Sequence, residues 1–190
     1  VDGRVAVAQV FDPDRRTSQL ISQLTRIVRV RTWVTRSPGW SERAQVQQAA
    51  VPILMATANG IRTPELLAAV EVDDRTMAVV EERPQRLRLL SDFPAEAISD
   101  EALAQVWREV RRMHHLGIAH EGLHDGSFAV DDDGRVWVLG LDRGEIAAPR
   151  LRMRLDRAEL LIATAMLVGG ERAITAADRA IGSADLANLP

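Results

Sequence analysis

The predicted order of strands and helices places this chain in the α+β class. Three observations carry the prediction. Apolar, β-branched stretches mark strands in the first part, apolar residues at helical spacing dominate the second part, and a loop with a small hairpin lies between two of the later helices. We therefore expect two lobes, one with a small β-sheet and helices over residues 1–84 and a mainly helical one over residues 85–190.

The first lobe is predicted to begin with a strand and two helical segments. Residues 4–11 are mostly apolar and β-branched, which predicts a strand that ends at the turn of residues 12–14. Apolar residues at helical spacing predict helices over 17–30 and 41–59. Pro52 is expected to kink the second helix or to start another, because proline cannot donate a helical hydrogen bond.

A hairpin and a linker complete the prediction for the first lobe. Strands over 66–72 and 76–83 flank a polar Asp-Asp-Arg turn, and Pro84 ends the second strand. Residues 87–97 show no sustained periodicity, so we expect a linker with one helical turn there.

The second lobe begins with the most regular helical pattern in the chain. Ser99 is the predicted N-cap, and Gly117 is the predicted end of this helix. Asp132-Asp133-Gly134 is a strong hairpin signal. The remaining predicted elements are two short strands and two helices, over 128–130, 135–141, 155–168 and 171–181.

Composition sets limits on function. The chain has 46% hydrophobic and 27% charged residues, which is ordinary for a globular protein, and its net charge of −3 does not favour nucleic-acid binding. It has no cysteine, so disulfides and thiolate metal sites are excluded. All 24 cationic residues are arginine, so no lysine is present to contact a phosphate. The longest apolar run, 160–170, is shorter than the ~20 residues that a membrane-spanning helix needs.

Two neighbouring segments carry the most specific signal. Residues 120–127 read His-Glu-Gly-Leu-His-Asp-Gly-Ser, and residues 139–144 read Leu-Gly-Leu-Asp-Arg-Gly. In this arrangement the chain resembles the protein-kinase-like fold, and within it the aminoglycoside phosphotransferases and the lipopolysaccharide (sugar) kinases. Those families carry H-G-D-L-H-P-x-N in the first segment, and the lipopolysaccharide kinases carry a sequence like I-D-F-D-R-G in the second.

The resemblance implies that the reactive positions are degenerate. Gly122 stands at the catalytic aspartate position, Ser127 at the magnesium-binding asparagine, and Gly140 at the magnesium-binding aspartate. Ala8 or Gln9 stands where the family strand presents lysine, and the helix that should carry its partner glutamate has no acidic residue at 47–49.

Some positions of the family pattern are retained. The resemblance implies that His120 and Asp156 are structural, with Asp156 bracing the loop, and that His120, Asp125, Ser127 and Asp142 are the remnants of a nucleotide site. We expect nucleotide binding to be weak or absent, and we predict no cofactor and no metal site.

Two other clusters favour ordinary structural roles. His114 and His115 are adjacent on a predicted helix and point in different directions, so with His120 and His124 they do not form a metal site by spacing. Residues 131–134 lack the alternating ligands of a calcium loop and are expected to form a solvated hairpin turn.

A narrower resemblance concerns the larger protein. Residues 116–120, 136–139 and 156–161 look like degenerate kinase-like domains joined, in actinobacterial membrane proteins, to a region resembling lysylphosphatidylglycerol synthases or flippases. This resemblance implies a cytoplasmic module at the inner face of the membrane, with a fused or adjacent transmembrane domain.

We expect a pseudokinase-type regulatory or scaffolding module that binds a protein partner and no nucleic acid. The alternative is an atypical ATP-dependent small-molecule or sugar phosphotransferase that uses Asp142, Asp125 or Glu121 in displaced roles. A third reading is a structural domain with an empty cleft that only tethers partners.

Overall fold

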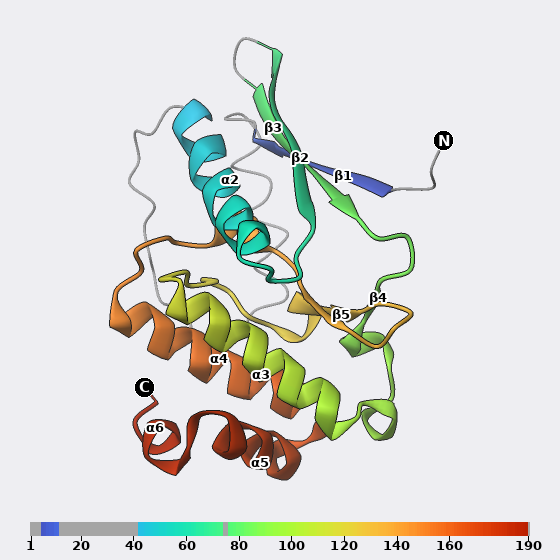
Figure 1. The fold of residues 1–190 in the computed structure, drawn as a ribbon, viewed down its shortest axis with the longest axis vertical. Helices are drawn as coiled ribbons and strands as arrows, with labels where there is room; N and C mark the ends of the chain where they lie inside the picture. The colour runs from blue at the N-terminus through green and yellow to red at the C-terminus, as the bar shows by residue number, and fades with distance from the viewer. Residues whose placement is uncertain (1–4, 12–41, 74–75, 190) are drawn as a thin grey trace, which may run out of the picture.

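The computed structural model describes residues 5–11, 42–73 and 76–189, and Figure 1 shows a small sheet with one helix above a layer of helices. Two antiparallel sheets and the surrounding helices make an α+β fold, which confirms the predicted class. The helix predicted over 17–30 lies outside the described residues. The division into lobes at residue 84 stays a prediction.

The first sheet forms as the sequence predicts. It contains β1 (Val5–Phe11), β2 (Glu65–Asp73) and β3 (Thr76–Arg83) in the order β1-β3-β2, and both pairs are antiparallel. The central strand, β3, contributes the fully buried Val79 to the core, since alternate side chains of a strand face the same side.

The helix α2 (Glu42–Ala58) packs against β2 and β3 of this sheet (Figure 1). It runs through Pro52 as one continuous helix, so of the two expected effects of Pro52, a kink or the start of another helix, the second was wrong. Its buried residues Val46, Ala49 and Ile53 keep the helical spacing on both sides of the proline. The packing of this face outweighs the one backbone hydrogen bond that proline cannot donate.

The second sheet is smaller and differs from prediction at both ends. Its strands are β4 (Arg88–Leu89), β5 (Phe128–Val130) and β6 (Val136–Val138), in that order. The predicted linker over 87–97 therefore contains a short strand, followed by 3₁₀ turns at Leu90–Asp92 and Ala95–Ala97. The strand predicted over 135–141 ends at Val138, because the chain turns at Gly140, which has φ +85°.

Four helices form the layer beneath the sheets. They are α3 (Asp100–His115), α4 (Arg150–Val168), α5 (Gly170–Ile181) and α6 (Ser183–Ala187). Ser99 caps α3 as predicted, since its side chain accepts a hydrogen bond from the backbone N–H of Ala102 at 3.1 Å. The prediction placed the start of α4 at residue 155, but Pro149 is its N-cap and the helix begins five residues earlier. The sequence analysis missed α6.

One hydrophobic core joins the sheets and the helices. Its largest fully buried side chains include Ile53 from α2, Trp107 from α3, Phe128 from β5 and Leu160 from α4. Within the described ranges, no helix is both long and apolar enough to cross a bilayer.

Candidate functional site

The carboxylate of Asp156 holds the loop that follows α3. Asp156 is 2% exposed; its Oδ2 accepts a hydrogen bond from the backbone N–H of His120 at 2.6 Å, and its Oδ1 accepts one from that of Glu121 at 3.0 Å. The Nε2 of His114 lies 3.1 Å from the same Oδ2. A charged acceptor forms strong hydrogen bonds, so α3 and α4 together position the loop backbone through this one side chain.

Glu159 is a second anchor, which the sequence analysis missed. Its Oε2 accepts a hydrogen bond from the backbone N–H of Leu123 at 3.0 Å. Burial raises the pKa of Glu159, and the hydrogen bond from Leu123 opposes that rise. Glu159 follows Asp156 by three residues, which places both carboxylates on one face of α4, and this spacing was the available signal.

His120 is buried beneath the loop. Its Nε2 lies 2.8 Å from the backbone oxygen of Leu139, and burial lowers the pKa of the ring. A carbonyl oxygen only accepts, so Nε2 carries the proton of the neutral ring. The Nδ1 of His120 has no hydrogen-bond partner, so the ring connects the two motif segments by one hydrogen bond.

Two glycines stand at the acidic positions of the motif. Gly140 lies beside His120, and Gly122 lies beside open space. A Cβ at Gly140 would lie 3.6 Å from Cε1 of His120, and a Cβ at Gly122 would have no atom within 4 Å. Gly140 has φ +85° and Gly122 has φ +156°, conformations that other residues rarely adopt. The positions that the resemblance assigns to two acidic residues therefore have backbone geometry suited to glycine and offer no side-chain ligand.

Ser127 serves the loop structure itself. It is 2% exposed, and its Oγ accepts a hydrogen bond from the backbone N–H of His124 at 3.0 Å. In return, the Nδ1 of His124 accepts one from the N–H of Gly126 at 3.0 Å. The two side chains cap the 3₁₀ turn at Asp125–Ser127, and Asp125 lies half-buried within that turn.

Asp142 interacts electrostatically with a second acidic residue, which belongs to the first sheet. It is buried in the turn at Leu141–Arg143, and its negative charge acts on Glu81 of β3. Burial is the main cause that raises the pKa of Glu81 to about 7. The negative charge of Asp142 adds to this rise, and the positive charge of Arg83 opposes it. The sequence analysis missed Glu81, although it lies two residues after the buried Val79 and so on the same face of β3.

Glu121 lies in a cluster of charged side chains near the start of α4. Arg152 Nε is 3.1 Å from Oε1 of Glu121 and 3.7 Å from Oε2 of Glu145. The Oε1 of Glu121 accepts no hydrogen bond, so its contact with Arg152 is a charge attraction without directed geometry. Burial and a carboxyl–carboxyl hydrogen bond with Glu145 raise the pKa of Glu121 to about 7, against the opposing charge of Arg152.

The strand that should supply the lysine has none, and the helix that should supply its partner glutamate has no acidic residue at the expected positions. In β1, Ala8 pairs with Val80 and Gln9 with Val79 through the backbone, while the side chain of Gln9 lies outside the described structure. In α2, residues 47–49 read Gln-Gln-Ala, and Ala49 is buried.

Neither a metal-binding cluster nor a calcium loop is seen in the part of the chain that the structure describes. Among the described residues, no three His, Asp or Glu side chains are grouped so that they could hold a metal ion. In the hairpin, Asp131 Oδ1 accepts hydrogen bonds from the backbone N–H groups of Asp133 and Arg135, and its Oδ2 accepts one from Trp137 Nε1. These contacts stabilise a turn.

Comparison with known proteins supports a kinase-like domain. No family model matches the chain. It is 28% identical over 75 residues to a 3-deoxy-D-manno-octulosonic acid kinase of Xylella fastidiosa, a match that covers 40% of this chain and 30% of that protein. It is 27% identical over 97 residues to the kinase of the same name from Stenotrophomonas maltophilia, covering 51% of this chain and 39% of that protein. The chain thus matches less than half the length of these relatives.

Solved structures show the same fold. The structure matches monomeric WbdD with a TM-score of 0.57 at 16% identity, over 86% of this chain and 35% of WbdD. A second WbdD structure, described as a bifunctional kinase-methyltransferase, gives a TM-score of 0.55. The chain is therefore a kinase-like domain with distant similarity to 3-deoxy-D-manno-octulosonic acid kinases.

Proposed function

We propose that this kinase-like domain is a pseudokinase-type module that binds a protein partner in a regulatory or scaffolding role and transfers no phosphate. The observation that carries the proposal is the pair Gly122 and Gly140, which places no carboxylate where the kinase pattern requires a base and a metal ligand. Both glycines have unusual φ angles, so the loop geometry is compatible with their presence.

The chemistry of phosphoryl transfer explains why these losses matter. Catalysis depends on positioning the reactants and on neutralising charge on the transferred group. A positioned base contributes roughly 10²–10⁴-fold, and magnesium requires oxygen ligands in near-octahedral geometry. Asp142 is the acidic remnant of the second motif, and its neighbour Glu81 is another acid. Arg83 offsets part of this negative charge, but no lysine is present in the chain.

The alternative, an atypical ATP-dependent sugar or small-molecule phosphotransferase, has two observations in its favour. The relatives are named as sugar-acid kinases. Asp142 and Glu81 also interact through their charges, so together they could hold one metal ion in place of the usual ligands. Glu121 is a weaker candidate, because Arg152 and Glu145 already contact it.

One experiment separates the two functions. The intact domain is incubated with ATP, Mg²⁺ or Mn²⁺, and 3-deoxy-D-manno-octulosonic acid, and ADP formation is measured beside a thermal-shift titration with ATP. We expect no ADP above the rate without protein. The phosphotransferase would be established if ADP formed, if Asp142→Asn abolished its formation, and if Asp133→Asn left it intact. Thermal stabilisation without ADP would indicate a nucleotide sensor.

We also infer, from the narrower resemblance, that the domain works at the inner face of the membrane as the cytoplasmic part of a larger membrane protein. Fractionation of cells that express the full gene tests this inference. We expect an antibody against this domain to detect a protein that stays in the membrane pellet after a high-salt wash. Recovery of the full-length product in the supernatant would contradict it.

A further inference from the structure

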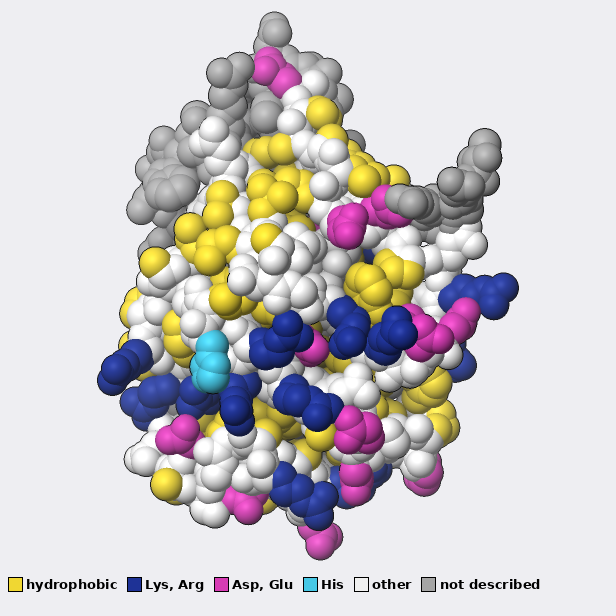
Figure 2. Space-filling view, in the orientation of Figure 1, with side chains coloured by type: hydrophobic (Ala, Val, Ile, Leu, Met, Phe, Trp, Pro, Cys, Tyr) yellow, Lys and Arg dark blue, Asp and Glu magenta, His cyan; other side chains and the backbone are white. Residues whose placement is uncertain are grey.

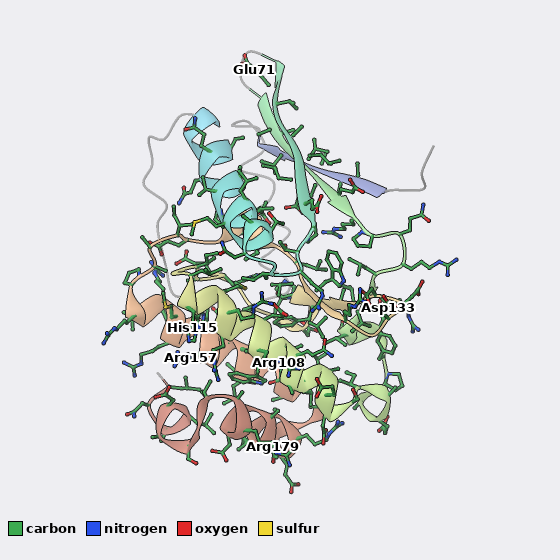
Figure 3. All side chains as sticks on the ribbon, viewed as in Figure 1. Glu71, Arg108, His115, Asp133, Arg157 and Arg179 are labelled. Atoms are coloured by element: carbon green, nitrogen blue, oxygen red, sulfur yellow. The ribbon has the colours of Figure 1, made fainter. Side chains whose placement is uncertain are left out.

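A basic groove lies on the helical layer, away from the two motif segments. It has a volume of about 380 Å³ and runs between α3 and α5, which pack side by side. Figure 2 shows dark blue side chains gathered across this face, and Figure 3 labels one arginine from each helix. The arginines that line the groove are Arg108 and Arg111 from α3 and Arg172 and Arg179 from α5.

These arginines differ in how firmly the fold already holds them. Arg172 donates to the backbone oxygens of Ala95 and Ile98 at 2.9 and 2.7 Å and contacts Asp100 at 2.7 Å, so it is a structural link. Arg108 pairs with Glu101 at 2.6 Å, and both side chains are more than half exposed. Exposed pairs of this kind contribute little to stability, so Arg108 is free to exchange its partner.

The other two arginines also keep donors for a ligand. Arg111 uses one nitrogen to donate to the backbone oxygen of Ala180 at 3.2 Å. Arg179 acts on Asp100 through charge alone. A guanidinium has five N–H donors, so each of these side chains retains several. Asp100 and Glu171 also line the groove, which leaves a formal excess of two positive charges.

Trp107 gives a second, independent indication of a ligand. It lines the groove and is 1% exposed, and its indole Nε1 has no hydrogen-bond partner. A buried donor without a partner costs free energy that an acceptor in the groove would recover.

We infer that this groove binds an acidic peptide segment of a partner protein. Arg108 and Arg111 lie about one helical turn apart and Arg172 and Arg179 about two turns apart, so the positive charges are spread along roughly 5 Å of the α3 wall and roughly 10 Å of the α5 wall. That spacing fits several carboxylates along a chain better than a single phosphate, and guanidinium groups bind carboxylates in bidentate geometry. Small residues, Ala104 and Ala176, line the groove between the walls and leave room for apolar side chains of the peptide.

The inference extends the proposed binding role by naming a surface and the chemistry of its partner. It does not depend on the motif segments, because none of the groove residues belongs to them. Detection of phosphotransfer would therefore overturn the proposed absence of activity and leave the inference about the groove intact. Absence of peptide binding would overturn the inference about the groove and leave the proposed absence of activity intact.

Fluorescence anisotropy tests the groove with a defined probe, a fluorescein-labelled peptide of three Glu-Ala-Asp-Leu repeats. The variant is Arg108→Ser with Arg179→Ser, since neither side chain holds a backbone oxygen in the structure. The matched control is Arg135→Ser with Arg150→Ser, which removes the same charge from exposed positions outside the groove. We expect the Kd of the groove variant to rise about tenfold and that of the control to change less than about twofold.

Each result decides the question. An unchanged Kd in the groove variant, or an equal rise in the control, would overturn the inference. Binding to phosphatidylglycerol vesicles without binding to the peptide would also overturn it and point to a membrane surface. In ¹⁵N-labelled protein, the indole signal that Trp107→Phe removes is expected to shift when the peptide is added, and its constancy would place the peptide elsewhere.

Discussion

Asp156 and Glu121, two acidic residues that contact or belong to the loop after α3, have different surroundings. Asp156 accepts backbone hydrogen bonds on both of its oxygens. Glu121 is partly buried beside Glu145, which favours the protonated form. Substituting either carboxylate by its amide therefore tests a different contribution of the loop to stability.

We predict that Asp156→Asn lowers the free energy of unfolding by about 2 kcal/mol. The amide has nearly the same shape, but it replaces one charged acceptor by a donor that faces a backbone N–H, and hydrogen bonds to charged groups contribute about 1.5–3 kcal/mol. Urea unfolding measures the change. The exposed Asp133→Asn is the control, and a loss of equal size there would mean that the loop anchor has no special role.

Glu121 is predicted to make stability depend on pH. Its pKa rises from 4.5 to about 7 on folding, so the folded state retains a proton that the unfolded chain loses above pH 4.5. Its contribution is complete at low pH and is lost as the pH rises towards 7. Thermal unfolding of Glu121→Gln should show a smaller fall in Tm between pH 5 and pH 8 than the unsubstituted protein. The exposed Glu96→Gln should leave the profile unchanged, and an identical profile for Glu121→Gln would contradict the assignment.

At the scale of elements, local signals explain where α3 begins and where α2 and α3 end. Ser99 caps α3, and Gly60 and Gly117 follow α2 and α3 with positive φ. Tertiary contacts then set the relative positions of elements. Arg112, for example, donates from α3 to the backbone oxygens of Asn59 and Gly60 at the end of α2, so the two helix ends are joined.

The α3 cap offers a test at this scale. We predict that Ser99→Ala destabilises the protein by about 1 kcal/mol, because the backbone N–H of Ala102 loses its acceptor. Ser99→Asp retains an acceptor and should be close to neutral. Chemical denaturation measures both variants, and equal losses in the two would show that the side-chain oxygen is not responsible.

At the scale of the whole molecule, one core holds the two sheets and the helices together. Leu160 of α4 is fully buried, whereas Leu151 of the same helix is 59% exposed. We predict that Leu160→Ala lowers the free energy of unfolding by about 2–5 kcal/mol, since it removes buried methyl groups and leaves a cavity. Leu151→Ala, the same substitution on the same helix, should change it by less than about 0.5 kcal/mol. Similar effects from both would mean that α4 is not packed as described.

The chain's own pattern was sufficient for the α+β class, the hairpin of β2 and β3, and the span of α3. These depend on side-chain periodicity, turn residues and caps, which are local properties. The same pattern was insufficient for β4 and for the start of α4. A two-residue strand such as Arg88–Leu89 forms only because β5 is beside it, and no local signal specifies such a pairing.

The candidate site divides in the same way. The missing acidic side chains at Gly122 and Gly140 are facts of the sequence and its resemblance to kinases. That Glu159 joins Asp156 as an anchor and that Glu81 interacts electrostatically with Asp142 depend on residues far apart in the chain. Only folding brings such groups within hydrogen-bonding or Coulombic range, so the sequence alone determined which side chains are present and the tertiary structure decided which of them interact.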